Sequence, residues 1–405
     1  MQVLDGIRVL DVSIAMAGPF AAQKLGDLGA DVIKVEPVSG EWQRHTAAGG
    51  ATGNEMNASF LSLNRNKRSV ALNLKIQEAR EALYKLVEGA DVFLQNYRPG
   101  VASRLGVDYD TLRKINPKLI YVSISGYGED GPYAQRAGQD LVLQGISGAL
   151  ASTQRTGEAP RPAPYFLVDT FTAYSAFEGT LAALFYREKT GQGQRVSVNM
   201  LDAITAAQMQ EITVHTVGQV KQKPSESIQG HSYIRAPYGV YRTLDDYIVV
   251  AFAEPKLLAE VFGDDRLFQY DAERDGFTNR DEISNLVEEN LLTNTTQHWL
   301  DTLLDAGVWA GPVNDYDELL DDPQIVHNET FVEYTHPTEG YVKTPGFPFR
   351  LERTAQAVQR PAPTAGEHTT EVLEQVGLTP EEVESLLSSK AAHQGRTNLP
   401  MSSVR

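Results

Sequence analysis

The sequence predicts an α/β fold in which a Rossmann-like large domain with a parallel sheet is joined to a small α+β domain. Three observations support this prediction. Short apolar runs alternate with helical patterns through the first half of the chain. The opening segment reads as a complete strand–helix–strand unit. After residue 235, two short alternating strands and several helical segments follow in an acidic stretch.

The opening unit spans residues 7–35. Ile7–Val12 has the composition of a buried strand, Pro19 can open a helix, and Asp31–Val35 is the next strand. Because a helix connects them, the two strands are expected to be parallel. Gly18 stands alone at a turn where a dinucleotide-binding unit carries several glycines, so a dinucleotide site is only weakly indicated.

Further strands extend the sheet after a long, glycine-containing connection at residues 40–62. Loops of this length in compact domains often have a function. The turn Asn96–Gly100 follows a strand directly, and open α/β sheets bind ligands at such strand ends. The glycine-rich loop Gly126–Pro132 either lets main chain approach a ligand or is a plain turn. We expect these elements: strands Val70–Leu74, Asp91–Gln95 and Leu119–Ser125, and helices Gln77–Glu88 and Gly138–Leu150.

The segment Pro162–Ala203 holds the central candidate residue, Asp169. The apolar run Phe166–Val168 ends at this carboxylate, and a helical pattern follows as far as Gly191, before a short strand at Val196–Val198. An Asp at a helix entrance is a common N-cap, because its carboxylate accepts hydrogen bonds from first-turn amides. The same position suits a poorly solvated carboxylate nucleophile that the helix N-terminus keeps ionised. Spacing alone leaves both interpretations open.

The second half of the chain contains two polar, proline-containing stretches, residues 221–235 and 309–330, which have the composition of linkers. They separate a small domain at 236–308 from the first part of the large domain at 1–220 and from a closing segment at 331–405. We expect these elements: a helical run Leu201–Val217, strands Ala236–Thr243 and Asp246–Ala251 around a tight turn, helices to Ala306, strands from Phe331 to Leu351, helices near Glu367–Val376 and Pro380–Leu387, and a frayed tail after Ser389.

Composition excludes several classes of function. The chain of 405 residues has no cysteine, which removes disulfides, thiolate catalysis and zinc–thiolate sites and fits a cytoplasmic location. Its net charge of −17 argues against nucleic acid as a partner, although the nearly balanced residues 1–110 could bind a phosphorylated small ligand. We expect no membrane span, no secretion and no metal site. Because the Ser-hydrolase elbow and the Walker loop are also missing, carboxylate chemistry is the main enzymatic option.

A series of short motifs runs along nearly the whole chain, and their order and spacing are more specific than any one of them. They are Gly6–Asp11, Ala17–Pro19, Leu28–Glu36, Asn66–Ser69, Asn96–Gly100, Gly126–Gly128, Arg187–Gln194, Ala236–Gly239 and Gly366–Thr369. Together they resemble the family III CoA-transferases of the CaiB/BaiF type, the group that contains formyl-CoA transferase and the carnitine CoA-transferases.

The resemblance implies an enzyme, an acyl-CoA:carboxylate CoA-transferase that moves CoA from a donor acyl-CoA to an acceptor carboxylic acid (EC 2.8.3). It implies that Asp169 is the nucleophile, since the family's catalytic Asp follows a short apolar run and precedes the motif found at Arg187–Gln194. The implied intermediates are an aspartyl mixed anhydride and an aspartyl-CoA thioester. Both keep the acyl group activated, so no permanently bound cofactor, ATP or metal is implied, and CoA enters as a substrate.

The resemblance also implies a CoA site along the carboxyl edge of the large-domain sheet. Lys75 and Arg104 could pair with phosphates and Tyr97 could stack on adenine, although exposed basic residues are also ordinary surface charges. Pro37 stands where family members often have an arginine, and Ser225–Gly230 lacks the glycine run that covers the carboxylate in some members. The implied CoA contacts are Ala17, Leu72, Lys75, Asn96, Tyr97, Arg98, Arg104, Arg136 and Ala137.

The acceptor acid is less defined by the motifs. Arg44, His45 and Tyr127 are candidates for binding a substrate carboxylate, which would suit a dicarboxylic or hydroxy acid. The resemblance further implies an interlocked-ring homodimer whose large domain uses both chain ends, with 221–235 and 309–330 as linkers.

Two alternatives stay open within this frame. The α-methylacyl-CoA racemases share the fold and use a His–Asp pair with the His in a Gly-His-Asp triplet. Here the triplet is Gly138-Gln139-Asp140, and a glutamine amide cannot act as an acid or base. The other alternative is a non-catalytic CoA-binding paralogue, against which the intact Asp169 argues.

Overall fold

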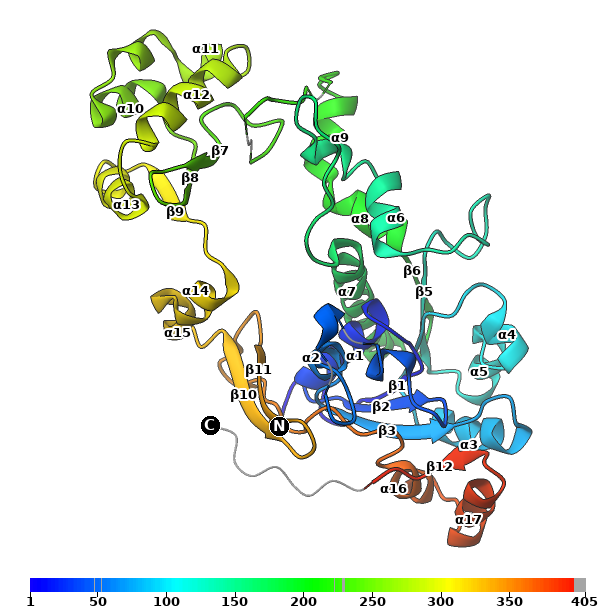
Figure 1. Ribbon diagram of the computed structural model, residues 1–405. Coiled ribbons are helices and arrows are strands. Elements are labelled where there is room, and N and C mark those ends of the chain that lie inside the picture. The colour runs from blue at the N-terminus through cyan, green and yellow to red at the C-terminus, as the bar shows by residue number, and fades with distance from the viewer. Residues whose placement is uncertain (47, 52, 222, 228–229, 397–405) are drawn as a thin grey trace. The chain divides into compact units, whose positions relative to one another are not determined.

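The computed structural model describes the chain except for residues 47, 52, 222, 228–229 and 397–405, and its elements are labelled in Figure 1. The chain packs into two compact units. Unit 1 comprises Met1–Leu143, Phe166–Ile204 and Gln324–Arg405, and unit 2 comprises Gln144–Tyr165 and Thr205–Pro323. The predicted domain limits stay a prediction, and segments 144–165 and 205–220, which that prediction put in the large domain, pack within unit 2.

Unit 1 is built on a seven-stranded sheet in the order β12-β3-β2-β1-β4-β5-β6. The strands are β1 (Arg8–Asp11), β2 (Asp31–Glu36), β3 (Lys67–Leu72), β4 (Val92–Gln95), β5 (Ile120–Ser125), β6 (Arg195–Asn199) and β12 (Ala392–His393). Strands β1 to β6 are parallel, and β12 pairs antiparallel with β3. The strand order reverses between β1 and β4, and open α/β sheets bind ligands outside the carboxyl ends at such a reversal. The prediction of an α/β fold with a large parallel sheet is confirmed.

Helices cover both faces of this sheet (Figure 1). Successive strand residues point to opposite faces, so Leu10 packs on one side and Val9 on the other. The first face meets α3 (Gln77–Glu88), α5 (Tyr109–Ile115), α16 (Thr369–Gln375) and α17 (Pro380–Ser388). The second face meets α1 (Ala17–Asp27) and α7 (Leu167–Thr190), which pack against each other. Because both faces are covered, the strands are apolar nearly throughout, and the loops carry the polar groups.

Several connections differ from the sequence prediction. The expected loop at 40–62 contains η1 (Trp42–Arg44), η2 (Ala48–Gly50) and α2 (Ala58–Leu63). The expected frayed tail forms β12, which pairs with the otherwise open edge of β3, while its last residues lie outside the described part. The expected linker at 309–330 contains β9 (Trp309–Pro312), α14 (Tyr316–Asp321) and α15 (Pro323–His327), and the helical run after Leu201 divides into α8 (Met200–Ala207) and α9 (Met209–Thr216). The remaining short helices are α4 (Val101–Leu105), α6 (Asp140–Ile146) and η3 (Ala151–Thr153).

Unit 2 contains an antiparallel sheet of β7 (Gly239–Arg242), β8 (Tyr247–Ala251) and β9. Ile248 and Val250 of β8 are buried, while Tyr247 and Val249 are exposed, so one face of the sheet packs against helices. These helices are α10 (Pro255–Phe262), η4 (Asp265–Gln269), α11 (Ala272–Asp275), α12 (Arg280–Leu291) and α13 (Thr296–Asp305). In unit 1, β10 (Phe331–His336) and β11 (Gly340–Pro345) form a separate antiparallel pair.

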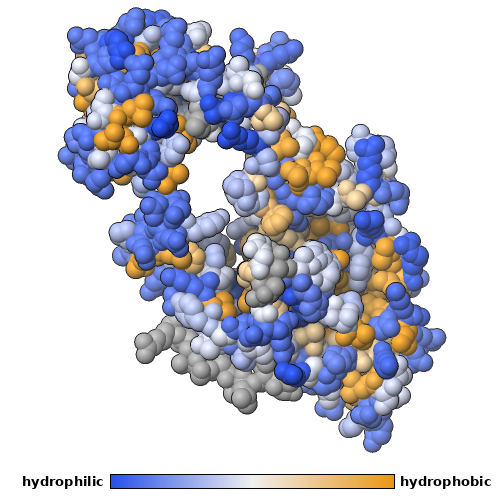
Figure 2. Space-filling model, in the orientation of Figure 1, coloured by the Kyte–Doolittle hydropathy of each residue, from blue (hydrophilic) through white to orange (hydrophobic). Residues whose placement is uncertain are grey.

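The protein surface seen in Figure 2 is mostly hydrophilic and is interrupted by separate hydrophobic patches. In the part of the chain that the structure describes, no helix combines the length and the apolar character needed to span a bilayer.

Candidate active site at the carboxyl edge of the sheet

Asp169 is the third residue of α7. The N-cap position of this helix is Phe166, and Leu167 is its first residue, so the interpretation of Asp169 as an N-cap is wrong. A different carboxylate caps the helix: Asp140 Oδ2 accepts hydrogen bonds from the main-chain amides of Val168, at 2.8 Å, and Asp169, at 3.1 Å. The carboxylate of Asp140 therefore takes the position at the helix N-terminus that the sequence suggested for Asp169.

Asp140 reaches this position because two glycines let two loops touch. A Cβ atom on Gly126, after β5, would lie 2.7 Å from the Cα atom of Gly138, before α6, so neither position has room for a side chain. Apolar side chains then anchor the start of α7 nearby, where Val168 packs with Leu143 of α6. The contact explains why Asp140 is buried beside α7 although 28 residues separate it from Val168.

The surroundings of the Asp169 carboxyl favour its protonated form. Burial is the main cause, and together with the nearby charge of Asp140 it raises the pKa of Asp169 to about 7. The main-chain amide of Ala17 lies close to the carboxyl and acts in the opposite direction, by lowering the pKa of Asp169. A desolvated carboxylate that still ionises near neutral pH is a stronger nucleophile than one in water, and strongly perturbed pKa values are typical of functional sites.

Ala17 belongs to the loop that follows β1 and opens α1. Its amide is the first in the helix and has no intrahelical partner, so it can donate to Asp169. Asn96 follows β4, the neighbouring strand across the order reversal, and its side chain binds this loop. Asn96 Oδ1 accepts from the Ile14 amide at 2.9 Å, and Asn96 Nδ2 donates to the Ile14 carbonyl at 2.8 Å. The structure therefore brings the predicted residues Ala17, Asn96 and Asp169 together, and it gives Asn96 a structural contact that the sequence did not predict.

Four predicted CoA contacts, which we call the exposed cations, follow the carboxyl ends of three parallel strands of the sheet. Lys75 follows β3, Arg98 and Arg104 follow β4, and Arg136 follows β5. All four side chains are exposed, and within the described residues none forms an ion pair with a carboxylate. Arg136, beside the exposed Ala137, lies over the ring of Tyr133 with its guanidinium carbon 3.7 Å from the ring centre. Parallel topology thus places unpaired positive charge at the same edge as Asp169.

Two other predicted CoA contacts are held inside unit 1. The Leu72 side chain is 2% exposed within the hydrophobic core, and β12 covers its strand edge. Tyr97 is half-buried against the same core, and burial raises its pKa to about 12. Their contacts with CoA stay predictions.

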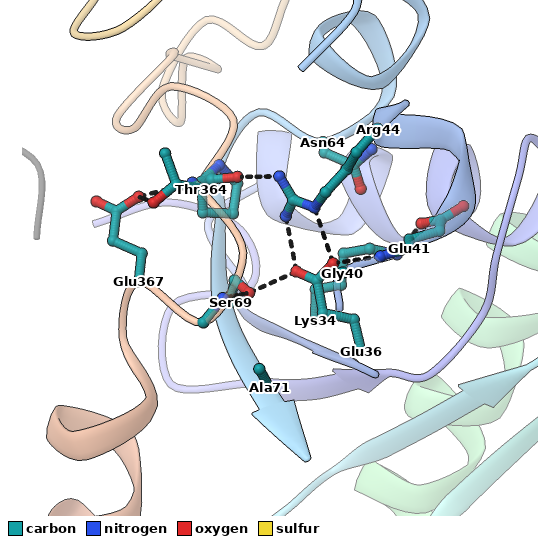
Figure 3. A network of polar contacts seen from close by, with 12 residues as sticks. Lys34, Glu36, Gly40, Glu41, Arg44, Asn64, Ser69, Ala71, Thr364 and Glu367 are labelled. Carbon is teal, nitrogen blue, oxygen red and sulfur yellow. Dashed lines mark hydrogen bonds and ion pairs between the residues drawn. The ribbon is translucent and has the colours of Figure 1, made fainter. Parts of the chain in front are cut away.

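Arg44, a candidate for binding a substrate carboxylate, is buried and fully engaged. Its Nε and Nη2 atoms donate to Glu36 at 2.8 and 2.6 Å, and its Nη1 atom donates to the Pro363 carbonyl at 2.8 Å (Figure 3). The proposed substrate role of Arg44 is therefore wrong. His45 is exposed, and Tyr127 is half-buried with its ring edge-on to Tyr133.

The sequence interpretation missed the contact of Asp140 with the start of α7. Asp140 was considered only as part of a triplet. It binds main-chain amides of a distant segment, and no local pattern reports such a contact. The segment Ser225–Gly230, where some family members have a glycine run, lies partly outside the described residues, because 228 and 229 are among the positions left out.

Comparisons with known proteins identify the family of the chain. Residues 4–369 match the profile of CoA-transferase family III. Succinyl-CoA:glutarate CoA-transferase from Homo sapiens is 34% identical over 384 residues, which cover 93% of this chain and 86% of the human protein. Succinyl-CoA:mesaconate CoA-transferase from Haloarcula marismortui is 33% identical, over 93% of this chain and 97% of that protein. The crystal structure of a CAIB/BAIF family protein from Brucella suis matches with a TM-score of 0.82 and 29% identity, over 93% of this chain and 99% of that chain. The resemblance seen in the motifs is confirmed, and the chain belongs to CoA-transferase family III.

Proposed function

We propose that this family III CoA-transferase transfers CoA between an acyl-CoA and a free carboxylic acid with Asp169 as its covalent nucleophile. The observation that carries the proposal is the position of this carboxyl. It is half-buried in the first turn of α7, beside the buried charge of Asp140, and the Ala17 amide lies close enough to lower its pKa. A carboxyl with this environment has both the desolvation and the orientation that a nucleophile needs.

In the proposed reaction, a carboxylate oxygen of Asp169 attacks the thioester carbonyl of the donor. The carbon–sulfur bond breaks, CoA leaves as a thiolate, and a mixed anhydride forms on Asp169. The thiolate then attacks the Asp169 carbonyl, so the donor acid leaves as a carboxylate and an aspartyl-CoA thioester forms. The acceptor carboxylate repeats the two steps in reverse order and restores free Asp169.

The environment of Asp169 supports this sequence. Water would hydrolyse the anhydride, and the packing of Val168 with Leu143 and Ile204 excludes solvent on one side of the residue. We assign stabilisation of the oxygens that gain charge in the tetrahedral intermediates to the Ala17 amide, which lies close to Asp169, and to amides of the loop that begins at Gly126. The Gly128 amide of this loop already donates to Ser125 Oγ at 3.1 Å. No step requires a metal or a bound cofactor, since every leaving group is a thiolate or a carboxylate.

The exposed cations support binding of CoA at the same edge. CoA carries a pyrophosphate and a ribose phosphate, and cations without carboxylate partners can bind phosphates without first breaking an ion pair. We assign Lys75, Arg98, Arg104 and Arg136 to the phosphates, and Ala17, Leu72, Asn96, Tyr97 and Ala137 to the remaining contacts.

We further propose that the substrates are dicarboxylic acids and their CoA thioesters. The names of the relatives from Homo sapiens and Haloarcula marismortui both contain succinyl-CoA, paired with glutarate and with mesaconate. An acetyl-CoA:oxalate CoA-transferase from Acetobacter aceti, 32% identical over 88% of this chain, also has a dicarboxylate in its name. Succinyl-CoA is therefore the first donor to test.

The assembly and the location are also proposals. We propose an interlocked homodimer in the cytoplasm, with a small central domain at 236–308 and linkers at 221–235 and 309–330. Met209 and Val217, at the start of α9 and just after it, are 70% and 78% exposed, and this supports burial against a second chain. Light scattering that gives one chain mass of 44.5 kDa in native buffer would contradict the dimer.

The nucleophile is tested by trapping. Succinyl-CoA and hydroxylamine are added to the enzyme, and the peptides are analysed by mass spectrometry. We expect an aspartyl hydroxamate at Asp169, because hydroxylamine cleaves both the anhydride and the thioester. Asp169→Asn should lower kcat by about 1,000-fold or more while CoA binding by calorimetry persists, because the amide cannot attack the donor.

Asp130→Asn is the matched control, since Asp130 is an exposed carboxylate in the loop after β5. It should retain both the hydroxamate and the turnover. A hydroxamate on another residue, or turnover by Asp169→Asn near the wild-type rate, would exclude Asp169 as the nucleophile. No observation favours the racemase alternative, because Gln139 stands where those enzymes have a histidine; exchange of deuterium into the α carbon of a 2-methylacyl-CoA would reinstate it.

A further inference from the structure

Six charged side chains form a cluster inside unit 1, beside the loop that connects β1 to α1. We call this the buried charge cluster; its members are Asp11, Lys34, Glu36, Glu41, Arg44 and Lys67, and Figure 3 shows its Lys34–Arg44 part. The side chains of Lys34 and Glu41 are 0% exposed and paired at 2.6 Å. Buried ion pairs contribute little to stability compared with apolar packing, so their presence points to a requirement other than stability.

Members of the buried charge cluster form hydrogen bonds with the main chain of the β1–α1 loop, residues 12–16. The Ser13 carbonyl accepts a hydrogen bond from Lys34 Nζ at 3.0 Å, and the Ser13 amide donates to Asp11 Oδ1 at 3.0 Å. The amide and the carbonyl of Ile14 are both bonded to Asn96. Side chains from three other segments thus hold the polar groups of successive loop residues.

Ala15 is the residue at which this loop is strained. Its φ is 62°, in the left-handed region that a residue with a Cβ atom rarely adopts. The Ala15 amide donates a hydrogen bond to Glu41 Oε1, and Glu41 Oε2 is the oxygen that pairs with Lys34. Glu41 therefore stabilises a left-handed conformation that an alanine does not favour.

The conformation of Ala15 decides where the next amides of the chain point. Two residues later, the Ala17 amide lies close enough to the carboxyl of Asp169 to lower its pKa. Close packing keeps this short path rigid, since a Cβ atom on Gly18 would lie 2.3 Å from Ser13 Oγ. We propose that Glu41, paired with Lys34, is a positioning residue that fixes Ala15 and so holds the Ala17 amide against the Asp169 carboxyl. The proposal rests on Asp169 being the nucleophile.

Two double variants isolate the hydrogen bond from the ion pair. Lys34→Met with Glu41→Gln removes both charges but retains an amide oxygen that can accept from Ala15. Lys34→Met with Glu41→Met removes the same charges, has a similar volume and offers no acceptor. We expect kcat of the second variant to be about 10-fold or more below that of the first. Removal of one preorganised hydrogen-bond donor lowers kcat by about 100- to 1,000-fold in other enzymes. The KM for the acyl-CoA should differ between the two by less than about 3-fold.

The pH dependence of kcat/KM separates positioning from a loss of folded protein. If the Ala17 amide turns away, the Asp169 carboxylate loses a donor, its pKa rises, and the acidic limb moves to higher pH in the Met/Met variant. The charge of Asp140 raises the pKa of Asp169, and Asp140 is unchanged in both variants. A smaller folded fraction would scale the whole profile without moving the limb. Equal kcat values and coincident limbs would overturn the proposal.

A measurement on the wild-type enzyme keeps the proposal testable if either variant fails to fold. Hydrogen–deuterium exchange of the peptide that covers residues 12–18 should be slow in the absence of substrate, because the amides of Ser13, Ile14 and Ala15 are all bonded to side chains. Exchange at the rate of an unstructured peptide would overturn the proposal. If the wild-type enzyme forms no hydroxamate at Asp169, the proposed function fails instead, and the two failures are thereby distinguished.

Discussion

Two groups of charged residues in unit 1 have opposite surroundings. In the buried charge cluster, Lys67 and Asp11 are 0% exposed, and Lys67 Nζ has three oxygen partners within 2.9 Å. The exposed cations, such as Lys75, are open to solvent and have no carboxylate partner within the described residues. The difference indicates that charged side chains have two separate roles in this unit. The buried charges bind the main chain of the β1–α1 loop, and the exposed charges have no carboxylate partner among the described residues, as the proposed phosphate site requires.

The largest effect expected from this comparison is on stability. Lys67→Met leaves the Asp11 carboxylate buried without its counter-ion, so the free energy of unfolding should fall by about 3–5 kcal/mol. Urea unfolding followed by circular dichroism measures the change. Asp11→Asn combined with Lys67→Met should recover part of the loss, because the uncompensated charge is then removed.

Lys75→Met is the matched control, since it removes the same side chain from an exposed position. The free energy of unfolding should change by less than about 0.5 kcal/mol. Similar losses for Lys67→Met and Lys75→Met would show that the two groups of charges do not differ in the way the structure indicates.

A smaller effect is expected on CoA binding. Lys75 precedes α3 at the carboxyl edge of the sheet, whereas Lys85 lies in the last turn of the same helix and pairs with Glu88 at 3.1 Å. Lys75→Ala should weaken CoA binding by about 5-fold at low salt, and the difference should shrink as salt rises, because salt screens exposed charges. Lys85→Ala should bind CoA as the wild type does. Calorimetric titration at two salt concentrations makes the comparison, and equal losses would remove Lys75 from the phosphate site.

The elements of the large sheet could be predicted from the sequence, because each strand has its own apolar run and each helix its own pattern. Ile7–Val12 and Asp31–Val35 were located within a residue or two of β1 and β2. The role of Arg44 was predicted wrongly, because an arginine next to a histidine in a polar loop has the same local appearance whether or not Glu36 lies opposite. The N-cap interpretation of Asp169 failed because the carboxylate of Asp140, from another segment, accepts the hydrogen bond from the Val168 amide at the start of α7.

The same distinction defines what a sequence can reveal about the site. Asp169 was identified as a candidate because a predicted apolar run meets a predicted helix there, and the family resemblance implied its role and the exposed cations. Glu41 acts on Ala15 across 26 residues, through an amide and a left-handed conformation that leave no local pattern. Positioning contacts of this kind depend on tertiary structure, and only the fold reveals them.

The smallest expected effect concerns the pH dependence, and it tests whether a buried charge can act on the reaction without touching the substrate. The proposed nucleophile Asp169 would have to be ionised to attack, and its pKa is raised to about 7 by burial and by Asp140, so kcat/KM should fall as the pH decreases through about 7. Asp140→Asn retains an oxygen that can accept from the Val168 and Asp169 amides but removes the negative charge. Without that charge the pKa of Asp169 decreases, and the acidic limb of kcat/KM should move to lower pH while kcat on the plateau changes by less than about 3-fold.

Asp130→Asn, which removes an exposed carboxylate, should leave the limb in place. A limb that does not move in Asp140→Asn would mean that burial alone sets the pKa of Asp169 and that Asp140 serves only to cap α7.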